Sequence, residues 1–272
     1  MAGVSGIEQI AEAFARALAD GRRAALMPYL MGGYPDLETS AAIGLAYADN
    51  GADLVELGVP FSDPLADGPV IHAAATAALR AGATLPAVLE VAATIARRVP
   101  VIVMCYVNPI LVRGLERFAD ALVAAGVSGL IVPDLPLEEA ADTREACAQR
   151  GLAFVPLVAP TTPQERLARI GATASGFLYT VSLTGTTGER SGLDGGLAAV
   201  VARAAACSQV PVAVGFGIST PEQAAAAARA GAAGVIVGTR LVRAAGEAPD
   251  PAAAAGALVR DLSTALSASP LS

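Results

Sequence analysis

The sequence predicts a single (β/α)8 barrel, the TIM barrel, with an extra helix at its N-terminus and with residues 1–272 in one domain. Eight short apolar runs alternate with Ala-rich helical stretches along the whole chain, as repeated strand–helix units do. Several helical stretches end on a glycine shortly before the next strand, for example Gly51 and Gly151. An open doubly wound sheet usually has fewer strands and a Gly-x-Gly-x-x-Gly turn after the first strand, so the barrel is the better match.

The expected elements follow these runs in order. Strands are expected at 25–31, 53–58, 101–107, 129–133, 153–158, 176–181, 212–216 and 234–238. Helices are expected at 7–20 and near 36–50, 68–98, 113–126, 137–150, 163–171, 195–207, 220–231 and 252–267. Two of them have start signals, Thr162-Pro-Gln-Glu165 and Thr220-Pro-Glu-Gln223, in which a hydroxyl caps the helix and an acid or amide completes a capping box. In such a barrel the functional residues lie at the C-terminal ends of the strands.

Composition and charge exclude several classes of function. The net charge is −7, and the 18 basic residues are scattered singly or in pairs, so no basic stripe is available for nucleic acid. No apolar run is long enough to span a bilayer, and the N-terminal helix lacks the pattern of a signal peptide. Three widely spaced cysteines fit buried thiols in a reducing compartment. We therefore expect a cytoplasmic protein with no nucleic-acid and no membrane partner.

The absence of lysine and the presence of only one histidine limit the possible reaction mechanisms. The chain has no lysine, so Schiff-base aldol chemistry is excluded, and it has one histidine, His72. A metal-assisted aldolase normally draws on several histidine and carboxylate ligands, so no metal site is expected. His72 follows the acidic segment on an expected helix, where a surface role is the more common one, and it is left outside the site.

The segment from Glu56 to Pro69 is the strongest candidate for chemistry. The strand before it alternates, so Glu56 points to the same side as Leu54, into the core. A carboxylate buried without a partner costs several kcal/mol, roughly, and a glutamate kept there is either a hydrogen-bonded structural group or an acid–base catalyst. The following turn adds Asp63 and Asp67.

The loops after the last three strands are rich in glycine and hydroxyl groups, at 184–188, 215–219 and 238–239. Glycine lets backbone N–H groups approach an oxyanion, and a short helix that begins at Gly238-Thr239 would add its dipole. TIM barrels often bind phosphate after strands 7 and 8. A purely structural use of these glycines in turns remains open.

Several motifs together resemble one family, the tryptophan synthase alpha subunit, over the length of the chain. They are Met31-Gly-Gly-Tyr-Pro35, the run from Glu56 to Pro69, Tyr106-Val-Asn-Pro109, Pro133-Asp-Leu-Pro136, the run from Gly217 to Gln223, and the run from Ala230 to Gly238. The resemblance implies a lyase that cleaves indole-3-glycerol phosphate into indole and glyceraldehyde 3-phosphate, in the biosynthesis of tryptophan. It also implies a partner beta subunit in an alpha2beta2 heterotetramer. No cofactor is expected in this chain, because pyridoxal phosphate belongs to the beta subunit.

The resemblance also implies the roles of individual residues. Glu56 is expected to transfer the proton at indole C3 and the proton of the glycerol hydroxyl, and Asp67 to accept the indole N–H bond. Tyr179 would orient Glu56 or the substrate, although a barrel-core aromatic is an equally good reading. Tyr29 and Leu135 would line the indole slot.

The remaining residues carried over from the family bind phosphate, close over the substrate or face the partner. Phosphate binding is expected of Gly188, Gly217, Gly238 and Thr239. Thr187 is expected on a lid, in which Thr186 stands where the family commonly has valine. Asp63 and Asn108 are expected at the beta-subunit interface, which would include the 62–64 turn and the end of a strand at 106–110.

Three alternatives remain at this stage. One is a ketose-forming isomerase on a phosphate-binding barrel, but such enzymes place their acid and base at the ends of strands 1 and 5, where Met31 and Val158 stand here. Another is a stand-alone lyase that releases free indole with the same residues. The third is a catalytically silent partner of a beta subunit, which intact Glu56 and Asp67 argue against.

Overall fold

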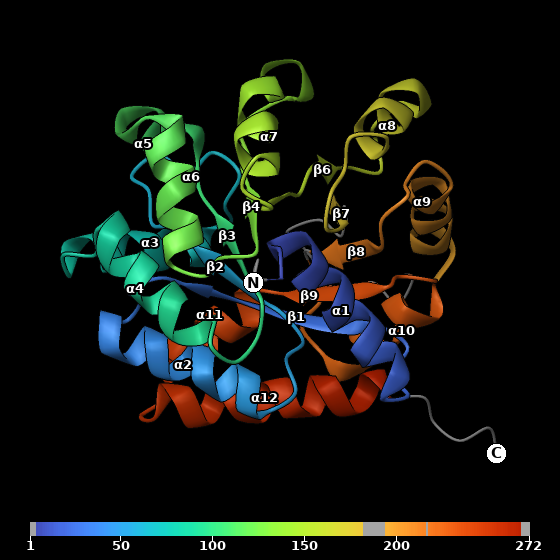
Figure 1. Cartoon of the computed structure of the whole chain (residues 1–272). Helices are drawn as coiled ribbons and strands as arrows, with labels where there is room; N and C mark the ends of the chain where they lie inside the picture. Colours follow the sequence, from blue (N-terminus) through green and yellow to red (C-terminus); the bar gives the residue numbers. More distant parts are fainter. Residues whose placement is uncertain (1–3, 182–193, 216, 268–272) are drawn as a thin grey trace.

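A computed structural model describes residues 4–181, 194–215 and 217–267. Within these ranges, nine parallel strands form one sheet in the order β5-β4-β3-β2-β1-β9-β8-β7-β6, with helices packed around it (Figure 1). The strands are β1 (Ala25–Met31), β2 (Val55–Gly58), β3 (Val101–Met104), β4 (Gly129–Ile131), β5 (Ala153–Phe154), β6 (Leu157–Val158), β7 (Leu178–Val181), β8 (Val212–Gly215) and β9 (Gly234–Val237).

The sheet closes on itself through one stretch of chain. β5 and β6 are the two halves of the single strand expected at 153–158, and they are separated by Val155 and Pro156. The first half pairs with β4 and the second with β7. Between them the N–H of Val155 donates to the carbonyl of Leu130 (2.9 Å), and the carbonyl of Pro156 accepts from the N–H of Tyr179 (3.1 Å). The expected eight-stranded barrel is therefore confirmed, with its fifth strand interrupted.

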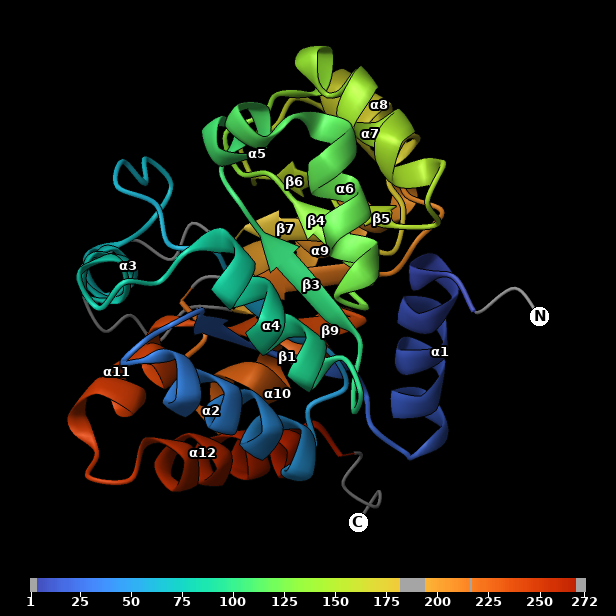
Figure 2. The ribbon, with the colours of Figure 1, turned by 60° about the vertical axis from the view of Figure 1, so that its left-hand side comes forward.

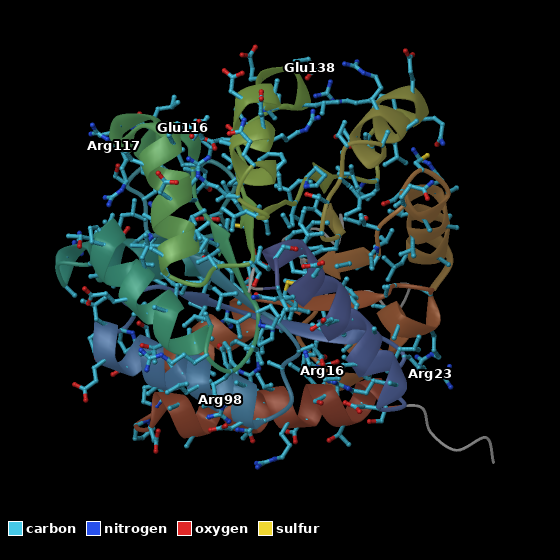
Figure 3. All side chains as sticks on the ribbon, viewed as in Figure 1. Arg16, Arg23, Arg98, Glu116, Arg117 and Glu138 are labelled. Carbon is cyan, nitrogen blue, oxygen red and sulfur yellow. The ribbon has the colours of Figure 1, made fainter. Side chains whose placement is uncertain are left out.

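Twelve α-helices and one 3-10 helix lie within the described ranges. They are α1 (Gly6–Ala19), α2 (Leu37–Asp49), α3 (Pro69–Arg80), α4 (Leu85–Ile95), α5 (Val107–Arg113), α6 (Leu115–Ala124), η1 (Leu137–Glu139), α7 (Ala141–Ala148), α8 (Gln164–Gly171), α9 (Asp194–Ala206), α10 (Pro221–Arg229), α11 (Thr239–Glu247) and α12 (Pro251–Leu266). In Figure 3 the labelled side chains Arg98, Glu116 and Glu138 lie on the outside of this layer, and all three are exposed. These three charged side chains thus face outward from an apolar core.

The helix expected at 68–98 is two helices, so this prediction was wrong in its continuity. Gly82 takes a left-handed conformation with φ +88° and ends α3. The hydroxyl of Thr84 then accepts from the N–H of Ala87 and begins α4, with a proline in its first turn. Among the described residues no single helix is long and apolar enough to cross a membrane, whereas α3 and α4, bent by 111°, reach that length only together.

The strand expected at 101–107 was also wrong at its end. β3 stops at Met104, and the motif Tyr106-Val-Asn-Pro109 begins helix α5. The cap comes from another loop, because the carboxylate of Asp134 accepts from the N–H of Val107 (2.9 Å). Of the two capping boxes, that of Thr220 and Gln223 is confirmed. That of Thr162 was wrong, because its hydroxyl instead accepts from the N–H of Ala159 (2.9 Å) and Pro163 precedes the helix without a side-chain cap.

The N-terminal end of the barrel is closed by α1, the expected extra helix. Ile10 and Phe14 of this helix are buried, and a Cβ at Gly234, the first residue of β9, would lie 3.0 Å from the Phe14 ring. Figure 2 shows α1 at one end of the barrel and the turn before α3 at the opposite end. Beside α1, Arg22 forms an isolated antiparallel bridge with Ser267, so the two ends of the barrel chain lie next to each other.

Candidate active site

Glu56 lies in β2 and points into the barrel, as the strand alternation predicts. It is paired in register with Tyr29 of β1 and Ile102 of β3, and its exposure is 1%. Its Oε2 atom has no hydrogen-bond partner among the described residues. Burial, and then the charge of Asp67, raise the pKa of Glu56 to about 8. The side chain therefore holds a proton at neutral pH.

Asp67 lies in the turn between β2 and α3 and is half-buried. Burial raises its pKa to about 6, while hydrogen bonding from Tyr106 and the nearby His72 act in the opposite direction. His72 itself is exposed on α3. At neutral pH the site thus holds a neutral Glu56 beside an ionised Asp67. Two carboxyl groups whose environments separate their pKa values can take an acid role and an anionic role at the same time.

Two tyrosines flank Glu56, and each packs its hydroxyl over a strand glycine. A Cβ at Gly58 would lie 2.0 Å from the hydroxyl oxygen of Tyr29, and a Cβ at Gly215 would lie 2.3 Å from that of Tyr179. Both rings are buried, and burial together with the charge of Glu56 raises the pKa of each phenol well above its ordinary range. The structure therefore brings Tyr29 and Tyr179 to the same carboxyl group from two different strands.

A cavity of about 620 Å³ opens beside Asp67. Leu135, Met104 and Val132 supply apolar wall, and Val181 lines it from the end of β7. This volume and lining suit a planar apolar ligand with a few polar anchors. Leu135 and Asp67 line this cavity, whereas Tyr29, Glu56 and Tyr179 are not among the residues that line it.

The glycines predicted for phosphate binding lie after neighbouring strands. β8 pairs with β9, and Gly217 follows the former while Gly238 follows the latter, so both are at the C-terminal edge of the sheet. Gly217 has φ +79°, and Gly238 precedes α11, whose first residue Thr239 is exposed. The first N–H groups of a helix have no partner within it and point toward this edge. Thr187 and Gly188 lie outside the described residues.

The residues predicted at the partner interface lie on two exposed segments. Asp63 is exposed in the turn before α3, and Asn108 is exposed in the first turn of α5 rather than at a strand end. The same two segments carry large exposed apolar side chains: Leu65 (92%), Leu111 (64%) and Val112 (82%). Single apolar side chains are common at protein surfaces, and only a contiguous patch of them marks a contact site.

Sequence reasoning placed Tyr106 only in the expected interface segment at 106–110 and gave it no part in the active site. It is 3% exposed, and its hydroxyl accepts from the N–H of Ala66 (3.0 Å). The contact spans 40 residues of sequence, so no local pattern could have indicated it. Over the part of the chain that the structure describes, no group of three or more His, Cys, Asp or Glu side chains could hold a metal ion.

Comparison with known proteins gives one family throughout. The family model described as "Tryptophan synthase alpha chain" matches residues 14–266. The tryptophan synthase alpha chain of Prochlorococcus marinus (strain MIT 9313) is 51% identical over 236 residues, which is 86% of each chain. That of Geobacter sulfurreducens is 48% identical over 240 residues, 87% of this chain and 90% of the relative.

Solved structures of tryptophan synthase also match this chain. The structure of Mycobacterium tuberculosis tryptophan synthase in space group F222 contains a chain with TM-score 0.88 and 39% identity, covering 96% of this chain and 98% of that one. Tryptophan synthase subunit alpha from Legionella pneumophila (strain Paris) has TM-score 0.86 and 37% identity, covering 95% and 98%. The barrel, the two carboxyl groups at its C-terminal end and these matches lead to one conclusion: the chain belongs to the tryptophan synthase alpha chain family.

Proposed function

We propose that Glu56 and Asp67 carry the chemistry of this chain, which is a lyase of tryptophan biosynthesis that cleaves indole-3-glycerol phosphate into indole and glyceraldehyde 3-phosphate. The observation that supports these roles is the difference between the two carboxyl groups: the pKa of Glu56 is about 8 and that of Asp67 about 6. One is an acid and the other an anion over the same range of pH. Retro-aldol cleavage of this substrate requires both.

Glu56 acts first as an acid and then as a base. It gives its proton to C3 of the indole ring, which makes the ring an electron sink. The resulting carboxylate takes the proton of the hydroxyl on the adjacent glycerol carbon. The carbon–carbon bond breaks, its electron pair returns to the ring as indole, and the former hydroxyl becomes the aldehyde. Glu56 ends with a proton, so the group is ready for the next turnover.

Asp67 stabilises the cation that forms between these steps. Once C3 is protonated the ring carries a positive charge, and its N–H becomes a stronger donor. An ionised carboxylate facing the cavity accepts that N–H more strongly in the transition state than in the ground state, which is the requirement for catalysis. Leu135 and Tyr29 would hold the ring, and Tyr179 would orient Glu56.

The phosphate group is assigned to the loops after β8 and β9 and to the N-terminus of α11. Gly217, Gly238 and Thr239 supply backbone N–H groups and one hydroxyl there, and Gly188 would complete the site. Thr187 would contact the acidic turn when the lid closes. Neutral donors and a helix dipole bind an anion without lysine.

The partner of the chain is a tryptophan synthase beta subunit, as the family implies. We assign the interface to the segments with Asp63 and Asn108, where Leu65, Leu111 and Val112 are exposed. The proposed assembly is an alpha2beta2 heterotetramer in the cytoplasm, with residues 1–272 as one domain. The chain uses no cofactor of its own, and pyridoxal phosphate belongs to the beta subunit.

The test is to incubate the purified chain with indole-3-glycerol phosphate and to measure indole, with and without a beta subunit. We expect indole in both cases and a faster rate with the beta subunit. Equal rates together with no co-purification would favour a stand-alone lyase. Absence of indole in both would favour a silent partner and would overturn the roles of Glu56 and Asp67.

A further inference from the structure

Tyr106 lies where three loops of the candidate active site meet. It follows β3, precedes α5 and reaches across to the turn between β2 and α3. Its ring stacks on Phe61 at the beginning of that turn, with ring centroids 5.2 Å apart and planes at 28°. Its hydroxyl accepts from the N–H of Ala66 near the end of the turn (3.0 Å). One side chain thus contacts both ends of the segment that carries Asp67.

The bond from Ala66 decides which groups the Tyr106 hydroxyl can contact with its proton. A phenol has one proton, and its oxygen is already accepting from Ala66, so the proton is left for an acceptor nearby. The carboxyl group of Asp67, the next residue, interacts with this hydroxyl, and the interaction lowers the pKa of Asp67.

Tyr106 is itself held in place from a third loop. The carboxylate of Asp134, which follows β4, accepts from the N–H of Val107, the first residue of α5. This bond fixes the backbone at the point where the chain leaves Tyr106. With a buried ring and an anchored backbone, the side chain has little freedom to move away from Asp67.

From this geometry we infer that Tyr106 is a positioning residue for Asp67: its stacked ring and its hydroxyl fix the turn that carries the carboxylate at the edge of the cavity. The inference rests on the proposed role of Asp67. It differs from a structural role, since it assigns to the hydroxyl an effect on one ionisation in the reaction.

Several titratable groups face Asp67 or Tyr106 and influence the ionisation of Asp67. Glu56 and Tyr29 face it from β2 and β1, and His72 faces it from α3. Asp134 acts on Tyr106 from the loop after β4. Burial disfavours the anion, and among these neighbours the hydroxyl of Tyr106 and His72 favour it. Removing the hydroxyl therefore moves the ionisation of Asp67 to higher pH.

The test is the pH profile of kcat/KM for Tyr106→Phe, which keeps the ring on Phe61 and removes the hydroxyl that accepts from Ala66 and interacts with Asp67. Wild-type activity should rise as Asp67 ionises and fall as Glu56 loses its proton. In the variant we expect the acidic limb to move up by about one pH unit, which makes kcat/KM roughly tenfold lower at the acidic end of the profile. At the plateau kcat should fall by roughly tenfold, with KM changed by less than about threefold.

The control is Phe61→Leu, which removes the stacking partner and leaves the hydroxyl. It should lower the melting temperature and keep the acidic limb at its wild-type position. A Tyr106→Phe profile with an unmoved acidic limb, or a limb moved equally by Phe61→Leu, overturns the inference. A wild-type chain that makes no indole overturns the proposed function instead, so the two failures are distinguishable.

Discussion

Asp53 and Glu56 are both buried carboxyl groups, three residues apart, with Asp53 before β2 and Glu56 within it, and their hydrogen bonding differs. Asp53 is bound by the guanidinium of Arg22 through both oxygens and accepts from the N–H of Leu26 (2.8 Å). Glu56 has an oxygen without a partner among the described residues. The first closes the N-terminal end of the barrel beside α1, and the second lies toward the C-terminal end, where the cavity opens.

The difference separates a carboxyl group that stabilises the fold, Asp53, from one that is available for chemistry, Glu56. Burial raises the pKa of both carboxyl groups, but at Asp53 the hydrogen bonds from Leu26 and Arg22 and the charge of Arg22 oppose this rise. A carboxyl group without them has a pKa set mainly by burial and is free to gain and lose a proton. Substitution of Asp53 should therefore lower mainly the stability of the fold, and substitution of Glu56 should lower mainly the activity.

The largest expected effect is on activity, in Glu56→Gln. The amide keeps the shape of the side chain but cannot transfer a proton, so kcat should fall by about 10³-fold or more while the substrate still binds. Steady-state assay of indole release and a binding titration would measure the two effects. Activity within tenfold of wild type would show that Glu56 belongs with Asp53 as a structural group.

The next effect is on stability, in Asp53→Ala. Removing this carboxylate leaves the mostly buried Arg22 guanidinium with only the Gly51 carbonyl (3.0 Å) and the exposed Asp20 (3.9 Å) as partners, which should cost up to about 3–5 kcal/mol of unfolding free energy. The matched control is Asp49→Ala, which breaks an ion pair with Arg98 whose two side chains are 53% and 52% exposed. That change should cost less than about 1 kcal/mol. Equal losses in urea unfolding would remove the distinction between the two pairs.

The third effect is the contribution of Glu56 to the pH dependence of stability, which extends to higher pH than that of Asp67, whose raised pKa is about 6. The pKa of Glu56 is about 8 in the folded chain, above the ordinary value of 4.5. Between these values the folded chain holds a proton that the unfolded chain releases, so stability is greatest at low pH and falls as pH rises toward 8. Wild type should lose about 1 kcal/mol per pH unit relative to Glu56→Gln over this window. Parallel stability profiles from pH 5 to 8 would contradict it.

The smallest effect concerns the tyrosine beside Glu56. In Gly58→Ala the new methyl group would meet the hydroxyl of Tyr29, which should cost roughly 1–3 kcal/mol in stability. Gly196→Ala is the control, since no atom lies within 4 Å of the added Cβ in α9. Adding Tyr29→Phe to Gly58→Ala removes the nearest atom and should restore part of the loss. Strictly additive effects of the two substitutions in thermal melts would exclude the contact.

Much of this molecule could be predicted from local sequence pattern. The alternation around Glu56 is a property of a strand, so its inward direction needed no other part of the chain. The cap of α10 is likewise local, because Thr220 and Gln223 bond within one turn. Strand positions agree within two residues for the same reason, except at 101–107 and in the interrupted strand at 153–158.

What could not be predicted depends on contacts between distant segments. The start of α5 is capped by Asp134, 27 residues further along the chain, and Thr162 is drawn away from capping α8 by the N–H of Ala159. The role of Tyr106 likewise depends on a turn 40 residues earlier. The pKa difference between Glu56 and Asp67 depends on how deeply each side chain is buried. The sequence indicates that Glu56 points inward but not how deeply it is buried.

The bridge between Arg22 and Ser267 has a consequence for chain design. The N–H of Arg23 also donates to the carbonyl of Leu266 (2.8 Å), so the beginning of the barrel and the end of its last helix are already neighbours. A ring of strands whose first and last segments touch has no required starting point. A direct link between them would leave out α1, which precedes Arg22, so a circular permutant that keeps this helix needs a linker from Ser267 to its start at Gly6, with new ends opened in a surface loop remote from the cavity.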